Sequence, residues 1–233
     1  MAVSSRKPMP RRVAHARRLT HFRRHLLRWY AVHQRDLPWR KTRDPYAILV
    51  SEIMLQQTQV DRVVPKYHEF LRKYPTVGHL AKADPREVRK TWYPLGYNVR
   101  PARLQQIARE SVAQYGGKIP NRHEDLMAMD GVGRYTAGAV LSFAFRKDAP
   151  ILDTNVRRVL RRVFGVAGDP MRAPANQRLW DLAEEVIPRG KGYVFNQALM
   201  DFGATVCTAR KPACLLCPMR PVCPAYPDGV LHE

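Results

Sequence analysis

The sequence predicts an all-α protein, and two observations carry that prediction. Apolar residues recur at spacings of three and four along most of the chain, while the alternating pattern of strands is absent. Gly and Pro stand between these periodic segments and mark their ends. The 45% apolar and 26% charged residues are typical of a folded chain, and no apolar stretch is long enough to cross a bilayer.

The chain opens on a basic segment that precedes an amphipathic helix. Residues 1–16 combine basic residues with prolines and are expected to form a flexible arm, although an organelle transit peptide has the same character. Leu19, Phe22 and Leu26 then begin a helix over 17–33. Further helices are expected over 45–55, 59–74, 86–92, 101–115, 122–129, 134–145, 155–164, 175–187 and 193–202, with Asp84 and Asn121 as caps.

The charge of the chain requires a polyanionic partner. Lys and Arg number 40 against 20 Asp and Glu, which gives a formal net charge of +20. Such a charge attracts polyanions over a long range, so nucleic acid is the first candidate partner and an acidic membrane surface the second.

Four cysteines, Cys207, Cys214, Cys217 and Cys223, form a C-x6-C-x2-C-x5-C run near the end of the chain. Disulfides would be spread more widely, so this clustering indicates a metal site in an intracellular protein. Four sulfur ligands suit either zinc or a [4Fe-4S] cluster. Structural zinc sites usually pair two C-x2-C knuckles and this run has one, which favours iron-sulfur.

A glycine-containing turn lies between two expected helices. Gly131 and Gly133 allow the backbone to turn tightly, and the amides that open the next helix at Arg134 then point toward an anion. Such a hairpin can hold a DNA phosphate without reading sequence, although an ordinary turn between helices has a similar pattern.

Two carboxylates stand out. Glu52 lies in an apolar helix, where a carboxylate is costly unless it has a function or an ion-pair partner. Asp153 follows Ile151 and Leu152 at the start of a helix, where capping the helix is the alternative to a catalytic function.

These features occur together with several further motifs from about residue 37 to residue 223. The motifs are Leu37-Pro38-Trp39-Arg40, SEIMLQQTQV from Ser51, Leu95-Gly96-Tyr97, GVGRYTAG from Gly131, ILDTNV from Ile151, FNQALMD from Phe195 and the cysteine run. The chain thereby resembles the helix-hairpin-helix DNA glycosylases with an iron-sulfur cluster, which include endonuclease III, and within them the MutY adenine glycosylase family. The resemblance implies two helical lobes with a DNA cleft between them. A six-helix barrel with the hairpin would span 37–147, and 17–36 with 148–233 would form the cluster lobe.

The resemblance also implies the chemistry. Glu52 would protonate the departing base and Asp153 would stabilise the cationic sugar, with Tyr135 and Asn155 hydrogen-bonding around that carboxylate. Endonuclease III-like relatives carry a lysine at the position of Tyr135, where it forms a Schiff base. Tyrosine cannot, so the resemblance implies a monofunctional glycosylase; without the resemblance, Tyr135 would be read as a packed aromatic residue at a helix start.

The implied substrate is a mispaired base in double-stranded DNA. Trp39, Arg40 and Gln197 are implied beside an adenine pocket, and Gln56 and Gln57 beside the opposite base, with ordinary hydrogen bonding as the alternative. Adenine opposite 8-oxoguanine or guanine is favoured, because thymine or uracil glycosylases generally lack that glutamine pair. The sequence ends before the C-terminal recognition domain of larger family members, and Asn98 replaces a second tyrosine, so discrimination of 8-oxoguanine is expected to be poor.

The other classes of function remain open alternatives. They are a non-catalytic DNA-binding cluster protein and a basic protein of membrane surfaces. The glycosylase is expected to act as a monomer, without a membrane, in the cytoplasm or nucleoid, or in an organelle or nucleus if the source is eukaryotic.

Overall fold

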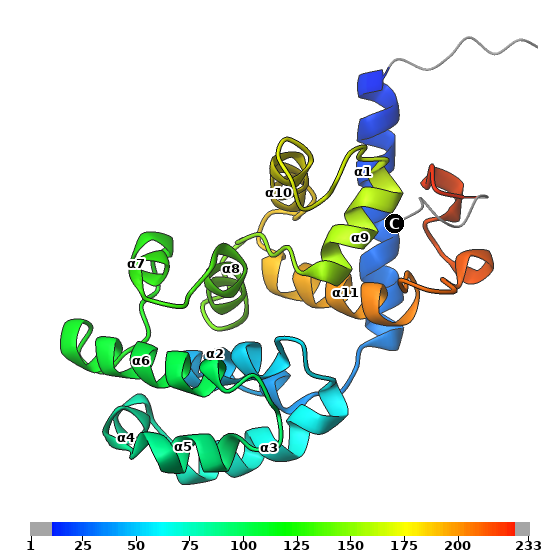
Figure 1. Cartoon of the computed structure of the whole chain (residues 1–233). Helices are drawn as coiled ribbons and strands as arrows, with labels where there is room; N and C mark the ends of the chain where they lie inside the picture. Colours follow the sequence, from blue (N-terminus) through cyan, green and yellow to red (C-terminus); the bar gives the residue numbers. More distant parts are fainter. Residues whose placement is uncertain (1–10, 227–233) are drawn as a thin grey trace, which may run out of the picture. The chain divides into compact units, whose positions relative to one another are not determined.

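Helices make up all the regular secondary structure of residues 11–226, which are the residues that the computed structural model describes (Figure 1). The all-α prediction is therefore confirmed. None of the helices within this range is both long and apolar enough to span a membrane. The chain divides into a middle unit, Arg35–Ile151, and a terminal unit that joins Met1–Gln34 to Leu152–Glu233.

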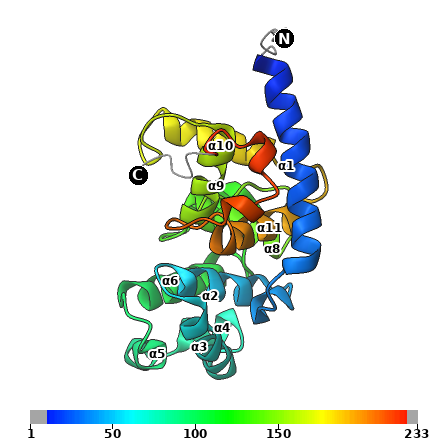
Figure 2. The same cartoon turned by 90° about the vertical axis from the view of Figure 1, so that its right-hand side faces the viewer.

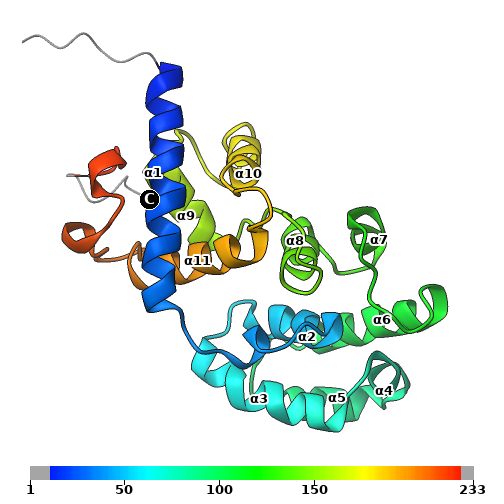
Figure 3. The ribbon, with the colours of Figure 1, turned by 180° about the vertical axis from the view of Figure 1, so that it is seen from behind.

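The middle unit is built around α2, because every residue of that helix from Tyr46 to Met54 is buried. Helix α2 packs against α3, α6 and α8, and Figure 3 shows α3, α4 and α5 in a layer beside α2 and α6. A helix that is buried on nearly every side is expected to be mainly apolar, and Ser51 and Glu52 are the buried polar exceptions in α2. The elements of this unit are η1 (Pro38–Arg40), α2 (Pro45–Leu55), α3 (Val60–Lys73), α4 (Val77–Lys82), α5 (Pro85–Trp92), α6 (Val99–Gln114), α7 (His123–Ala128) and α8 (Arg134–Phe143).

The terminal unit joins the two ends of the chain. Its helices are α1 (Arg11–His33), α9 (Thr154–Phe164), α10 (Ala175–Glu185) and α11 (Gly192–Thr205), followed by η2 (Cys214–Leu216) and η3 (Arg220–Val222). Helix α11 packs against both α1 and α9, and the ring of Phe22 meets that of Phe195 edge-on at 6.0 Å. Figure 2 shows the segment with η2 and η3 beside α1, where His21 hydrogen-bonds to the carbonyl of Pro218 at 2.9 Å.

The first helix is longer than the sequence predicts. Helix α1 begins at Arg11 instead of residue 17, so only residues 1–10 of the expected arm remain, and they lie outside the described residues. Side-chain contacts hold the early turns: Arg18 donates to the carbonyl of Val222 at 3.0 Å, and His15 contacts Glu185 at 2.9 Å. These partners lie far away in sequence, which is why helical periodicity did not reveal them.

Two shorter features also differ from the sequence-based expectation. Helix α4 was not predicted, because its six residues hold Gly78 and are too few to show a helical period. Asp84 caps α5 as expected, but Asn121 does not cap α7, whose N-cap is Arg122 without a side-chain bond.

Candidate active site

Glu52 and Tyr135 form a hydrogen-bonded pair inside the middle unit. Glu52 projects from α2 with only 3% of its surface exposed, and Tyr135 is the second residue of α8. The phenol donates to Oε2 of the carboxylate at 2.7 Å. Helix α2 packs against α8, so two segments that are 83 residues apart present these groups together. The family resemblance implies a place for Tyr135 around Asp153, and it does not imply this contact with Glu52.

The turn before α8 has the tight backbone that the sequence predicts. Gly131 has φ +86°, a conformation that favours glycine, and a Cβ there would lie only 3.2 Å from the side chain of Arg103. Gly133 is the N-cap residue of α8 and has no side chain to satisfy the first amides of the helix. The hairpin therefore offers amide donors beside Arg134 at the start of a ten-residue helix.

A close approach fixes α8 against the chain that follows it. A Cβ on Gly138 would lie 2.1 Å from the carbonyl oxygen of Pro150. Because no side chain fits there, glycine lets Pro150 and Ile151 lie directly against the helix that carries Tyr135.

In the terminal unit, Asp153 has two hydrogen-bonded oxygens. Oδ1 accepts from the amide of Val156 at 2.7 Å, which makes Asp153 the N-cap of α9, and Oδ2 accepts from Asn155 Nδ2 at 3.1 Å. Asp153 therefore caps the helix, as the alternative interpretation expected. Capping uses only Oδ1, because Oδ2 is bonded to the Asn155 side chain. Burial raises the pKa of Asp153, while these hydrogen bonds and the charge of Arg158 lower it less strongly.

Arg158 extends this arrangement toward the cysteine loop. Its Nη2 donates to Asn155 Oδ1 at 2.9 Å and to the carbonyl of Gly203 at 2.7 Å, and its Nε donates to the carbonyl of Cys207 at 2.8 Å. A Cβ on Gly203 would lie 2.8 Å from that of Asn155, so this glycine allows α11 to approach the start of α9. One guanidinium therefore connects the partner of Asp153 to the first cysteine.

The four cysteines line one pocket, together with Arg162, Val163, Phe202, Val206, Pro212 and Ala225. All four thiols are half-buried and carry no disulfide. Among residues 11–226, no three Cys, His, Asp or Glu side chains are arranged to hold a single metal ion. All four cysteines that the sequence predicts as ligands nevertheless line the same, mainly apolar pocket.

Arg162 holds the loop that begins at Cys207. It is 4% exposed, and it donates to the carbonyls of Thr208 at 2.7 Å and Ala209 at 3.1 Å. Its Nη1 also lies 3.7 Å from the Cys207 sulfur, and the amide of Met219 donates to the Cys217 sulfur at 3.4 Å. Burial raises the pKa of Cys207, and it raises the pKa of Cys217 to about 11. A positive group in the pocket would offset this penalty on the thiolates.

The three residues that the resemblance assigns to the base pocket, Trp39, Arg40 and Gln197, each have their own surroundings in the structure. Trp39 is 7% exposed and meets Tyr67 edge-on at 5.5 Å, so it packs in the core of the middle unit. Arg40 donates to the carbonyl of Arg35 at 2.9 Å. Gln197 is buried in α11 of the terminal unit.

The two glutamines expected at the opposite base follow α2. Gln56 is the C-cap residue of α2, and Gln57 is exposed with φ 55°.

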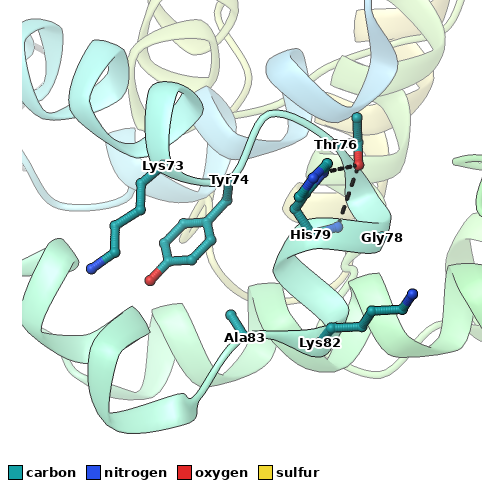
Figure 4. Close-up of a pocket in the computed structure, with 7 residues that line it drawn as sticks. All are labelled: Lys73, Tyr74, Thr76, Gly78, His79, Lys82 and Ala83. Atoms are coloured by element: carbon teal, nitrogen blue, oxygen red, sulfur yellow. Dashed lines mark hydrogen bonds between the residues drawn. The ribbon is translucent and has the colours of Figure 1, made fainter.

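The middle unit has a pocket of its own, and none of the predicted site residues lines it (Figure 4). Among its lining residues, Thr76 Oγ1 and His79 Nδ1 are hydrogen-bonded at 2.7 Å. The Lys73 ammonium, which also lines the pocket, donates to Glu87 outside it at 2.9 Å. Since it contains no predicted catalytic residue, we assign it no part in the chemistry. Its lining is Lys73, Tyr74, Thr76, Gly78, His79, Lys82 and Ala83.

Sequence reasoning missed three arginines that organise the sites: Arg100, Arg158 and Arg162. Arg100 and Arg162 are each 4% exposed. The sequence could have indicated that Arg158 and Arg162 have a structural role. They lie four residues apart on a helix whose other buried residues are valine and leucine.

Comparison with known proteins agrees with this fold and these motifs. Residues 50–185 match the family described as HhH-GPD superfamily base excision DNA repair protein. The chain is 45% identical over 217 residues to an adenine DNA glycosylase of Rattus norvegicus, which covers 89% of this chain and 42% of the relative. It is 40% identical over 213 residues to a thymine-DNA glycosylase of Aeropyrum pernix, which covers 90% of this chain and 96% of the relative.

A solved structure of a thermostable thymine-DNA glycosylase is also similar, with a TM-score of 0.85 and 38% identity over 91% of this chain and 98% of that chain. The chain spans about two fifths of the length of the mammalian adenine DNA glycosylases that it matches. The family match covers more than half of the chain, and it includes Glu52, the hairpin and Asp153. The chain therefore belongs to the HhH-GPD superfamily of base excision DNA repair proteins.

Proposed function

We propose that this protein is a monofunctional DNA glycosylase that hydrolyses the N-glycosidic bond of a mispaired base, with adenine opposite 8-oxoguanine or guanine as the first substrate. The observation that carries the proposal is the buried Glu52 carboxylate with the Tyr135 phenol 2.7 Å from it. Departure of a base requires a proton, and a carboxyl group inside an apolar helix is suited to hold one.

Each residue has a distinct step. Glu52 donates its proton to the ring nitrogen of the departing base, while Tyr135 fixes the orientation of the carboxyl group. Asp153, held by Asn155 and the Val156 amide, presents negative charge to the cationic sugar carbon. As the bond between the base and the sugar breaks, water adds to the cationic sugar carbon and gives its proton to the Glu52 carboxylate, which restores the acid and leaves an abasic site. A phenol forms no Schiff base, so the strand stays intact.

DNA binding is assigned to the net charge of +20, to the amides at Gly131 and Gly133 and to Arg134. We assign recognition of the flipped base to Trp39, Arg40 and Gln197. Gln56 and Gln57 would contact the opposite base. We propose that the protein acts inside the cell, as a monomer on double-stranded DNA.

Cys207, Cys214, Cys217 and Cys223 would hold a [4Fe-4S] cluster, since all four line one pocket. Bound there, the cluster would fix the loop that carries the basic residues Arg210, Lys211 and Arg220. Visible absorbance together with iron and sulfide content of the purified protein tests this assignment. Zinc without sulfide would contradict it.

A thymine or uracil glycosylase acting opposite guanine is the second candidate, because a thymine-DNA glycosylase is 40% identical and a solved one has a TM-score of 0.85. Duplexes that pair adenine, thymine or uracil with guanine or 8-oxoguanine distinguish the two. With enzyme in excess, adenine release supports the first candidate and pyrimidine release the second. No release from any duplex, with binding retained, would leave the non-catalytic DNA-binding protein.

A further inference from the structure

Helix α1 carries more positive charge than its packing uses. Its sequence holds seven arginines and no acidic residue. Two of these arginines bind inside the terminal unit: Arg18 Nε donates to the carbonyl of Val222 at 3.0 Å, and Arg23 Nε donates to the carbonyl of Val186 at 3.0 Å. These two guanidinium groups therefore hold α1 against other parts of the same unit.

Arg17, Arg24 and Arg28 make no such contacts. All three are exposed, and none forms a hydrogen bond or an ion pair with another residue of the range 11–226. Because a helix turns by about 100° per residue, the three lie within about 40° of one another. Phe22 and Leu26, both fully buried, lie on the opposite side of the helix. The three arginines, which we call the arginine tract, thus form one row at the surface, about 16 Å long.

The stability of the helix does not explain the arginine tract. Arg24 and Arg28 stand four residues apart, where two like charges repel and destabilise a helix. The helix dipole favours positive charge in the last turn, and the basic residue there is His33. The repulsion within the tract is therefore uncompensated until a negatively charged ligand binds.

The arginine tract borders the loop that holds the four cysteines (Figure 2). His21 is four residues after Arg17 and three before Arg24, so the three are neighbours on the helix surface. The Nε2 atom of His21 lies 2.9 Å from the carbonyl oxygen of Pro218. The exposed Arg220 follows two residues later in that loop. The tract and the basic loop therefore lie next to each other in the terminal unit.

A row of arginines fits the phosphates of a nucleic acid. The planar guanidinium group matches the oxygens of a phosphate, and a row of about 16 Å spans about five phosphates of one strand at about 3.4 Å each along the duplex axis. A helix that lies on an acidic membrane inserts its apolar face into the lipid. The apolar residues Phe22 and Leu26 are already buried in the protein, so the observations favour nucleic acid.

We propose that Arg17, Arg24 and Arg28 form a further DNA-binding site, which holds the phosphate backbone of the same duplex that the cysteine loop contacts. The inference rests on the DNA binding of the proposed function, and it assigns part of that binding to α1. The tract contributes affinity without regard to sequence, because it contacts phosphates and no base edges.

The salt dependence of binding tests these contacts. The triple variant Arg17→Gln, Arg24→Gln and Arg28→Gln removes three charges and retains side chains that suit a helix. Binding of an undamaged, fluorescently labelled duplex is titrated at a series of salt concentrations. Each lost phosphate contact should reduce the slope of log K against log salt by about 0.9, so the triple variant should lose about 2.7. If the triple variant does not fold, the three single variants replace it, and each should lose about 0.9.

The matched control is the triple variant Arg72→Gln, Arg86→Gln and Arg89→Gln. These arginines are exposed on α3 and α5 of the middle unit, and their replacement changes the net charge by the same amount. The control should keep the wild-type slope. An equal loss of slope in both triple variants would reduce the effect to net charge and overturn the inference. A folded α1 variant with the wild-type slope would overturn it as well.

Further measurements separate this inference from the proposed function. At saturating protein, the α1 variant should release adenine opposite 8-oxoguanine near the wild-type rate. A wild-type protein that binds duplex with a steep salt slope but releases no base would contradict the glycosylase function and leave the inference standing. Duplex binding without salt dependence in the wild type would contradict both.

Two other occupants of the arginine tract are distinguished in the same way. Binding stoichiometry should be one duplex per protein, and a second duplex that only the wild type binds would contradict a shared duplex. Vesicles containing phosphatidylserine test the membrane. If the α1 variant loses vesicle binding while its DNA slope stays at the wild-type value, the inference fails.

Discussion

Arg158 donates a hydrogen bond of 2.8 Å to the carbonyl oxygen of Cys207. The same side chain reaches Asn155, whose amide donates to Asp153. Three hydrogen bonds in series therefore connect the carboxylate assigned to the sugar to the cysteine loop, within a single unit of the fold.

Replacing Arg158 should impair excision more than DNA binding. Arg158→Met leaves Asn155 without the donor that orients it, and small misplacements at a reacting centre reduce rates by about a hundredfold. We expect a fall of roughly that size in single-turnover base release, with duplex affinity within a few fold of wild type. Gel-shift titration and quenched-flow release measure the two quantities. Arg178→Met, on the exposed face of α10, serves as the control.

Tyr135 should support Glu52 without giving strand cleavage. Tyr135→Phe removes the hydrogen bond that orients the carboxyl group and should slow release by up to about tenfold, as expected for the loss of one hydrogen bond. Tyr135→Lys places an amine at the same position. Borohydride should then trap a covalent protein-DNA adduct with this variant and none with the wild type. A trapped adduct of the wild-type protein would contradict the monofunctional assignment.

The carboxyl group of Asp153 should make stability depend on pH. Its pKa is raised on folding, so the native state binds more protons than the unfolded state between the usual aspartate range and the raised value. The free energy of unfolding therefore falls as pH rises through that window, and the loss is complete above it. Asp153→Asn retains a capping side chain, so it should melt about 2–4 °C higher than wild type at neutral pH.

This difference should vanish below pH ~3.8, the ordinary pKa of an aspartate side chain, because both proteins then carry a neutral side chain at this position. Calorimetry across the pH range checks the sign. A variant that is less stable than wild type at neutral pH would show that the charged form is favoured in the fold.

Two glycines within helices should respond in opposite ways to alanine. Gly138→Ala forces a Cβ against the carbonyl of Pro150 and should destabilise the protein by about 1–3 kcal/mol. Gly78→Ala in α4 meets only Thr76 Oγ1 at 3.8 Å and should stabilise by about 0.5–1 kcal/mol. Urea unfolding midpoints of the two variants measure both effects.

Sequence patterns predicted the features that are determined by residues close together in the chain. The apolar run around Glu52, the glycines of the hairpin and the four cysteines could all be identified from the chain alone. Long-range partners could not, because periodicity contains no information about them. Tyr135 donates to a carboxyl group 83 residues away, and Arg100 donates to the carbonyl of Met54, in the last turn of a helix 46 residues earlier.

Most of the contacts that the sequence did not predict are hydrogen bonds from arginine side chains to backbone carbonyls. Arg100, Arg158 and Arg162 all donate chiefly to carbonyl oxygens, which every residue possesses and which therefore leave no trace in the sequence. The early start of α1 has the same origin, since Arg18 binds the carbonyl of Val222.

The terminal unit takes its helices from both ends of the chain, whereas the middle unit is continuous. During synthesis, the middle unit can therefore assemble as soon as Ile151 has left the ribosome. Helix α1 is made before the middle unit but stays unpaired, with Phe22 and Leu26 uncovered, until α9 and α11 have been translated. A nascent chain stalled before residue 192 would expose that apolar stripe to chaperones and to aggregation.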